Sequence, residues 1–268
     1  MAESPGHVFN SLVEILARLR APDGCPWDRE QTRTSLKPHL IEEAYEVLDA
    51  LESSDPRHLA EELGDLLFQV MIHAQIASEL GEFTIADVLT GLVDKMVSRH
   101  PHVFGEASVS TAQEALTQWE RLKRREALAA GHHRSVLDGV PRALPALLRA
   151  QRLQGKASRV RFDWPDARAA WGKVEEEVRE AAAVLADNAR LTEELGDLLF
   201  SLVNVARLAG IDAEGALGQA SDKFRRRFAD MERRLHAEGK SVDSVPLEEL
   251  ERCWQAAKAQ EEPEQGWR

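Results

Sequence analysis

Residues 61–68 read EELGDLLF, and residues 193–200 repeat the same eight residues without a change. Around the first copy, apolar side chains recur at three- and four-residue spacing, for example at Leu59, Leu63 and Leu66. This spacing is typical of a helix with one buried face. A repeat period of about half the chain favours two similar domains over a solenoid of short repeats.

The repeat extends beyond the octapeptide in both directions. Glu-Glu-x-x-Glu precedes each copy, at 42–46 and at 176–180. After each copy, a Lys is followed four residues later by an Arg, and a Trp is followed four residues later by a Lys. These residues are Lys95, Arg99, Trp119 and Lys123 in the first half and Lys223, Arg227, Trp254 and Lys258 in the second. We predict an N-terminal domain at 1–130 and a C-terminal domain at 142–268, joined by a linker at 131–141 that contains Gly and Pro.

The composition is that of a soluble globular protein, with 43% hydrophobic and 30% charged residues. A formal net charge of −12 argues against a broad nucleic-acid-binding face and against binding to an anionic membrane. Cys25 and Cys253 form neither a metal-binding spacing nor a disulfide framework, which favours a reducing cytoplasm. The uncharged run at 66–78 is too short to cross a bilayer, which takes roughly 20 apolar residues.

No segment shows sustained strand alternation, so the sequence predicts an all-α fold of tandem duplicated helical-bundle domains. In the first half, we expect one helix from about Leu36 or Pro38 to Leu51 and another from about 57 to 80, separated by a turn at 53–56. In the second half, the corresponding helices are expected at 167–186 and 189–208.

The acidic motifs predict a metal site. Glu43 and Glu46 border the apolar face of one helix, and Glu62 and Asp65 have the same offset in the next, so two antiparallel helices can bring four carboxylates together. The second half offers a corresponding set, which comprises Glu177, Glu180, Glu194 and Asp197. Such carboxylates repel one another unless a hard cation lies between them. Magnesium fits best and manganese is the alternative, because the chain has no Cys or His set suited to zinc.

The basic and aromatic residues downstream suit a phosphorylated ligand. The Lys and Arg of each half can pair with phosphate oxygens. The Trp with its following Lys offers an aromatic face beside a cation, which can stack a base, and core packing is the open alternative. Gly64 and Gly196 lie inside predicted helices at a cost of about 1 kcal/mol each, so we expect close approach of another helix or a ligand there.

At this point the residues resemble a known family. Glu-Glu-x-x-Glu followed by Glu-x-x-Asp resembles the signature of the all-α nucleoside triphosphate pyrophosphohydrolases, and the chain is similar to their two-domain bacterial MazG group. Further matches are GCPWD at 24–28, RHPHVF at 99–104 and FDWPD at 162–166. The resemblance covers nearly the whole chain.

The resemblance implies hydrolysis of nucleoside triphosphates at the α-phosphorus to monophosphate and pyrophosphate, dependent on Mg²⁺. It also implies broad base specificity, clearance of unwanted nucleotides and a homodimer in which a second chain completes a four-helix arrangement. The resemblance further implies that both sets of four carboxylates are metal ligands and that the set in the second half is catalytic. It implies that the downstream Lys, Arg and Trp residues bind substrate, and those of the second half match the nucleotide-binding positions of the family.

The two copies differ in ways that bear on which is active. Ser221 stands where the family has an asparagine, and Gln69 and His73 of the first copy correspond to Ser201 and Val205 of the second. The resemblance favours the second domain as the catalyst, although either unit can be the weaker one.

Two readings compete with the hydrolase. The first is a helical interaction or regulatory module with catalytically silent acidic clusters, which would fold without metal and release no pyrophosphate. The second is a carboxylate-bridged di-iron bundle, which commonly uses Glu-x-x-His pairs. No histidine of the chain has a glutamate three residues before it, which argues against the di-iron reading.

Overall fold

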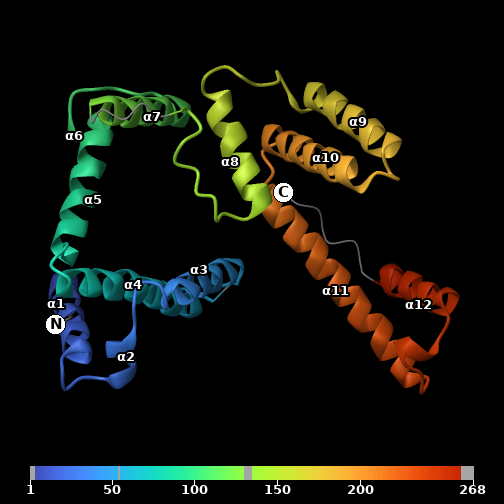
Figure 1. Cartoon of the computed structure of the whole chain (residues 1–268), viewed down its shortest axis with the longest axis horizontal. Coiled ribbons are helices and arrows are strands. Elements are labelled where there is room, and N and C mark those ends of the chain that lie inside the picture. The colour runs from blue at the N-terminus through green and yellow to red at the C-terminus, as the bar shows by residue number, and fades with distance from the viewer. Residues whose placement is uncertain (1–3, 54, 130–134, 261–268) are drawn as a thin grey trace. The chain divides into compact units, whose positions relative to one another are not determined.

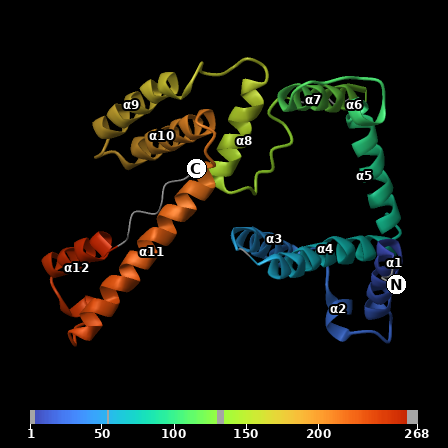
Figure 2. The same cartoon turned by 180° about the vertical axis from the view of Figure 1, so that it is seen from behind.

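The computed structural model of the protein describes residues 4–53, 55–129 and 135–260. The chain divides into two compact units, Met1–Arg125 and Glu126–Arg268. Every regular element in the described residues is a helix (Figure 1, and from behind in Figure 2), which confirms the all-α prediction. None of these helices is both long and apolar enough to cross a membrane.

The predicted domain limits of 1–130 and 142–268, with a linker at 131–141, stay predictions. Residues 1–3, 54, 130–134 and 261–268 of these ranges lie outside the described part of the chain.

The first unit is organised around two paired helices. Its elements are α1 (Pro5–Arg20), α2 (Pro26–Glu30), α3 (Lys37–Glu52), α4 (Pro56–Glu79), α5 (Ile85–Arg99), α6 (Pro101–Phe104) and α7 (Ala112–Ala129). Helix α3 packs against α4, and α4 also contacts α1 and α5. The core forms where α1 crosses the C-terminal half of α4, and its buried members are Leu16, Leu36, Met71, Ile72 and Ile76.

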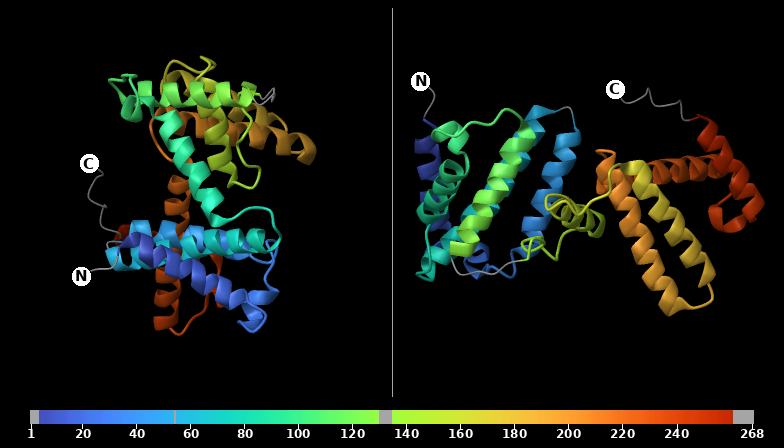
Figure 3. Two further views of the ribbon diagram at one scale, coloured as in Figure 1. Left: turned by 90° about the vertical axis from the view of Figure 1, so that its left-hand side faces the viewer. Right: turned by 90° about the horizontal axis from the view of Figure 1, so that it is seen from above.

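The second unit repeats the central pair. Its elements are α8 (Ala146–Ser158), α9 (Ala167–Ala183), α10 (Asn188–Leu208), α11 (Ala213–Ala237), the short 3₁₀ helix η1 (Val242–Ser244) and α12 (Leu247–Gln260). Helix α9 packs against α10, α8 contacts both α10 and α11, and α12 packs against α11 (Figure 3). The buried cluster between α11 and α12 contains Met231, Leu235 and Cys253.

The same capping chemistry starts both octapeptide helices. The side chain of Asp55 accepts a hydrogen bond from the backbone N–H of Arg57 at 2.9 Å, and that of Asp187 accepts one from Ala189 at 3.2 Å. An aspartate at this position satisfies a backbone donor that the helix leaves unpaired. Each octapeptide then begins five residues after the first residue of its helix, which places the acidic residues at equivalent heights on α4 and α10.

Candidate metal centres

The first acidic cluster combines one residue of α3 with two residues of α4. Glu43, Glu62 and Asp65 each offer a carboxylate oxygen, and the three oxygens lie within 4.8 Å of one another. Glu62 and Asp65 are three residues apart on α4, a spacing that places both on one face of the helix. The pairing of α3 with α4 brings Glu43 to this face.

The second cluster has the same construction in α9 and α10. Carboxylate oxygens of Glu177, Glu194 and Asp197 lie within 4.8 Å of one another. Glu177 is the most buried of the three, with 3% of its surface exposed. Its Oε2 atom is buried and has no hydrogen-bond partner among the described residues. A buried carboxylate oxygen without a partner is costly unless a cation or donor satisfies it.

The fourth predicted carboxylate of each set lies beside the cluster rather than within it. Glu46 and Glu180 are exposed and do not belong to the groups of three. Both still act on the clusters electrostatically, because Glu46 helps to raise the pKa of Glu43 and Glu180 helps to raise that of Glu194. The sequence predicted four convergent carboxylates in each unit. The structure brings three of them together and places the fourth beside them.

Each cluster contains a carboxyl group whose pKa is raised. Burial is the largest cause for Glu43, and the charges of Asp65 and Glu46 add to it. Burial is also the largest cause for Glu194, followed by the charges of Glu180 and Glu177. Desolvation and like charges both disfavour the ionised form. A cation between the carboxylates would remove the repulsion.

The two clusters differ in the side chains that contact them. In the first unit, Gln69 Nε2 lies 3.4 Å from Glu43 Oε1, and His58 Nδ1 lies 3.3 Å from Glu62 Oε1. In the second unit, Lys173 Nζ lies 2.7 Å from Glu177 Oε1. Of these three contacts, only that of Lys173 supplies a permanent positive charge.

The predicted phosphate- and base-binding residues of the second unit lie on α11 and α12. Lys223 is exposed and Arg227 is half-buried on α11, and Lys258 is exposed on α12. The Trp254 ring lies 5.1 Å from that of Phe224, within the cluster that joins α12 to α11. Helix α12 lies along the C-terminal half of α11, away from the α9–α10 pair (Figure 1). Within one chain, Trp254 therefore packs in a core that is separate from the acidic cluster.

The corresponding residues of the first unit also form a local contact. The guanidinium carbon of Arg99 lies 5.2 Å from the centre of the Trp119 ring, and the His100 ring lies 4.9 Å from it. Lys95 and Lys123 are exposed. The Trp119 ring therefore makes a cation–π interaction with Arg99 within the first unit.

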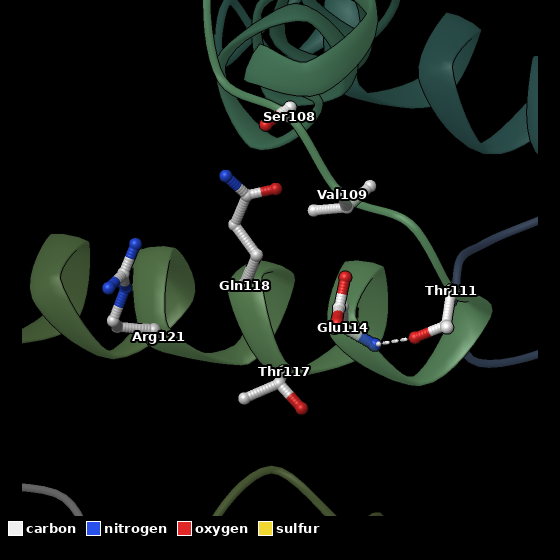
Figure 4. Close-up of a pocket in the computed structure, with 7 residues that line it drawn as sticks. All are labelled: Ser108, Val109, Thr111, Glu114, Thr117, Gln118 and Arg121. Carbon is white, nitrogen blue, oxygen red and sulfur yellow. Dashed lines mark hydrogen bonds between the residues drawn. The ribbon is translucent and has the colours of Figure 1, made fainter.

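A polar pocket of about 570 Å³ lies beside α7 in the first unit (Figure 4). In Figure 4, Gln118 points toward the segment that carries Ser108, whereas Thr117 points away from it. The lining residues are Ser108, Val109, Thr111, Glu114, Thr117, Gln118 and Arg121. This pocket contains no residue of either acidic cluster, so we do not assign the metal chemistry to it.

Comparisons with known proteins decide the family. A family model described as the MazG nucleotide pyrophosphohydrolase domain matches residues 31–104 and 169–231, and each segment contains one acidic cluster. The chain belongs to the MazG nucleotide pyrophosphohydrolase family. It is 46% identical over 258 residues to the nucleoside triphosphate pyrophosphohydrolase of Escherichia coli K12, covering 94% of this chain and 98% of that protein. It is 44% identical over 258 residues to the nucleoside triphosphate pyrophosphohydrolase/pyrophosphatase MazG of Thermotoga maritima, covering 96% and 98%.

The donor sets of this MazG-family chain fit a hard divalent cation. All the clustered atoms are carboxylate oxygens, which suit magnesium and manganese better than zinc. The unpaired Oε2 of Glu177 and the raised pKa of Glu194 both indicate a site that is short of positive charge.

A second pocket, of about 640 Å³, lies in the second unit next to its acidic cluster. Lys173, which contacts Glu177, is one of its lining residues. The sequence analysis gives no role to Gln154 and Asn204 of this pocket. It singles out other parts of the wall, namely the motif at 162–166 with Phe162, Asp163 and Trp164, the end of the octapeptide at Phe200, and Ser201.

Proposed function

We propose that this protein hydrolyses nucleoside triphosphates at the α-phosphorus to nucleoside monophosphates and pyrophosphate, with Mg²⁺ as cofactor, and that its second unit is the catalyst. The Escherichia coli and Thermotoga maritima relatives are nucleoside triphosphate pyrophosphohydrolases, which supports the overall activity. The observation that carries the assignment to the second unit is the buried Glu177 carboxylate, which lies within the cluster and contacts Lys173 in the wall of the 640 Å³ pocket.

The roles of the chain's residues follow from their charges. Glu177, Glu194 and Asp197 would hold the cation, with Glu180 as the neighbouring fourth carboxylate. A divalent cation in this site supplies Lewis acidity and neutralises charge on the triphosphate. Lys223 and Arg227, as family nucleotide-binding positions, would offset charge on the departing pyrophosphate. One of the glutamates would accept the proton of the attacking water.

The test is release of monophosphate and pyrophosphate from a panel of triphosphates with Mg²⁺. Wild type is compared with Glu194→Gln and with the matched first-unit variant Glu62→Gln. We expect Glu194→Gln to abolish release and Glu62→Gln to retain it. Hydrolysis in ¹⁸O-labelled water should place the label in the monophosphate, because attack at the α-phosphorus transfers the water oxygen there. Equal activity of all three proteins would favour the silent-cluster alternative, in which the chain is an interaction module.

We also propose that the chain forms a homodimer through the central helix pairs. Leu63 on α4 and Leu199 on α10 are each about half exposed, as are other large apolar residues on α3 and α9. Apolar faces of this kind mark interaction surfaces. A Cβ atom added at Gly64 or Gly196 would meet nothing within 4 Å, so neither glycine is explained by packing within its own chain. Close approach of a second copy would explain both glycines.

Light scattering coupled to size exclusion tests the dimer. We expect twice the chain mass for wild type and a smaller species for Leu63→Glu combined with Leu199→Glu. A monomeric wild type would contradict the proposal.

Broad base specificity, nucleotide clearance and a cytoplasmic location complete the proposed function.

A further inference from the structure

The polar pocket beside α7 has the size of a small-molecule site. Its volume of about 570 Å³ lies within the range of roughly 300–1,000 Å³ that is usual for ligand pockets. It belongs to the first unit, because its lining residues all lie between Ser108 and Arg121. It follows the motif at 99–104, to which the proposed function gives no role. A ligand in this pocket would bind outside both acidic clusters.

The motif orients one hydrogen-bond donor of the pocket. The Nδ1 atom of His102, on α6, lies 3.0 Å from Oε1 of Gln118, on α7. An amide oxygen only accepts hydrogen bonds, so Nδ1 of His102 carries the proton and donates this bond. The Nε2 group of Gln118 has no partner among the residues that the structure describes, and it is left to donate to a ligand.

An arginine places a positive charge next to that donor. Arg121 follows Gln118 by three residues on α7, and both side chains extend toward the segment that carries Ser108 (Figure 4). Within the described part of the chain, no carboxylate pairs with Arg121. The guanidinium, the amide nitrogen and the Ser108 hydroxyl therefore offer donors from two sides of the pocket. Such a set suits a phosphate group, because a guanidinium pairs with two phosphate oxygens and leaves the others to further donors.

The opposite end of the pocket carries a carboxylate. Glu114 lies seven residues before Arg121, which is about 10 Å along a helix. Its Oε2 atom accepts a hydrogen bond from the backbone N–H of Ser110 at 2.7 Å, and its Oε1 atom is left to accept from a hydroxyl group. The described lining residues include no aromatic side chain on which a base could stack. These features favour a sugar phosphate over a nucleotide.

The second unit lacks these donors at the equivalent place. Alignment of the two repeated Trp–Lys motifs pairs Gln118 with Cys253 and Arg121 with Ala256. Cys253 and Ala256 line a smaller pocket, of about 340 Å³, and both arginines of that pocket are paired with carboxylates. Of these two pockets, only the one in the first unit places an unpaired arginine beside an amide donor.

We propose that the α7 pocket binds a small sugar phosphate, with its phosphate at Gln118 and Arg121 and its hydroxyl groups toward Glu114. The inference goes beyond the proposed function, and it stands whether or not either acidic cluster hydrolyses a triphosphate. Binding requires no metal, because the protein itself supplies the positive charge. Since Arg121 is exposed, the affinity falls as the salt concentration rises.

Calorimetry with ribose 5-phosphate tests the site in the full-length protein. EDTA is present, so the phosphate cannot bind through a cation at an acidic cluster. The variants are Arg121→Ala, which installs the residue of the second unit, and Gln118→Glu, which keeps an acceptor for His102 but replaces the donor with a negative charge. The control is Arg125→Ala, since Arg125 is exposed on α7 and does not line the pocket. We expect each of the first two variants to weaken binding roughly tenfold and the control to leave it unchanged.

Inorganic phosphate, ribose and AMP are the comparison ligands. Phosphate and ribose should each bind about tenfold more weakly than ribose 5-phosphate, because each makes only part of the contacts. AMP should bind no more tightly than ribose 5-phosphate, and a clearly higher affinity for AMP would overturn the assignment to a sugar phosphate. Absence of ribose 5-phosphate binding at millimolar concentration, or an unchanged affinity in both Arg121→Ala and Gln118→Glu, overturns the site itself. Far-UV circular dichroism checks that each variant is folded, and Gln118→Glu decides alone if Arg121→Ala is not.

Discussion

The Nζ atom of Lys173 lies 2.7 Å from Oε1 of Glu177, which is one helical turn further along α9. It lies at the same distance from Oε1 of Glu176. Hydrogen bonds to Glu176 and then Glu177 raise the pKa of Lys173, so the lysine stays charged throughout the neutral pH range. Without metal, Lys173 is thus the counter-ion of the most buried carboxylate of the second cluster.

The first prediction concerns removal of this counter-ion. Lys173→Met keeps the length of the side chain but leaves Glu177 as a buried, uncompensated charge, which is strongly disfavoured. We expect the metal-free variant to unfold at a lower temperature than wild type and to gain more from added Mg²⁺. Thermal unfolding in EDTA and in Mg²⁺ measures both effects. Lys173→Arg is the control and should stay close to wild type, whereas an unchanged melting temperature for Lys173→Met would contradict the counter-ion role.

The second prediction is a dependence of metal-free stability on pH. The pKa of Glu194 is raised above its ordinary 4.5 by burial and by neighbouring carboxylates. Just above pH 4.5 the folded protein therefore holds this proton more tightly than the unfolded chain, so stability falls as pH rises through that window. Glu194→Gln removes the ionisable group. In EDTA, the variant should unfold at a higher temperature than wild type at pH 7 and at a similar temperature at pH 4.

Magnesium should reverse this order at pH 7, because the cation stabilises ionised wild type but has lost a ligand in the variant. Glu175→Gln serves as the control, since Glu175 is exposed on α9 and outside the cluster. A wild-type protein that remains more stable than Glu194→Gln in EDTA at pH 7 would rule out repulsion in the cluster.

Much of the fold follows from local sequence signals. The helix expected at 57–80 is α4, Pro56–Glu79, and the helix expected at 189–208 is α10, Asn188–Leu208. Both have an Asp cap and a continuous apolar stripe, so local preference and packing agree. The helix expected at 167–186 ends earlier, at Ala183, because the backbone leaves the helical region at Val184 before the cap at Asp187.

The site was only partly predictable, for geometric reasons. Helical spacing identified Glu62 with Asp65 as residues on one face, but which partner reaches them depends on the rotation of α3. That rotation brings in Glu43 and leaves Glu46 at the side. The 640 Å³ pocket combines residues from distant segments, such as Gln154 and Asn204, which no periodicity connects. For Trp254, stacking and packing were both open, and its contact with Phe224 shows packing within the chain.

The third prediction concerns a buried arginine that joins three parts of the first unit. Arg20 donates to Glu79 through Nε at 2.9 Å and Nη2 at 2.8 Å, and its Nη1 donates to the carbonyl oxygens of Asp28 and Gln31. We expect Arg20→Met to lower the free energy of unfolding by about 2 kcal/mol, below the range for fully buried pairs because Glu79 is partly exposed. Urea unfolding at pH 7 measures the loss.

The pH dependence provides a check on the same ion pair. The hydrogen bond from Arg20 lowers the pKa of Glu79 below 4.5, so its contribution is present above that value and is lost as pH falls through the lowered pKa. The stability difference between wild type and Arg20→Met should therefore shrink at acidic pH. Arg18→Met is the control, because Arg18 pairs with Asp23 on the exposed surface and its loss should have no measurable effect. A pH-independent difference would assign the effect of Arg20 to packing alone.

The last prediction comes from strained backbone at the rim of the 640 Å³ pocket. Arg161 has φ of +67° and is the only residue other than glycine with positive φ among the described residues. It lies in the turn that follows α8, where the backbone N–H of Arg161 donates to the carbonyl oxygen of Ser158 and that of Phe162 donates to Ala157, an arrangement that favours glycine. Gly210, with φ of +74°, ends α10 with the same pattern of bonds.

We expect Arg161→Gly to raise the free energy of unfolding by roughly 0.5–1 kcal/mol, because glycine adopts positive φ without strain. We expect Gly210→Ala to lower it by about as much, because alanine is strained at positive φ. Thermal unfolding with matched scan conditions compares the two variants. If Arg161→Gly is less stable than wild type, the arginine side chain contributes more to folding than its backbone conformation costs. A gain in stability accompanied by a higher KM would instead show that this strain is retained for the ligand that enters the pocket.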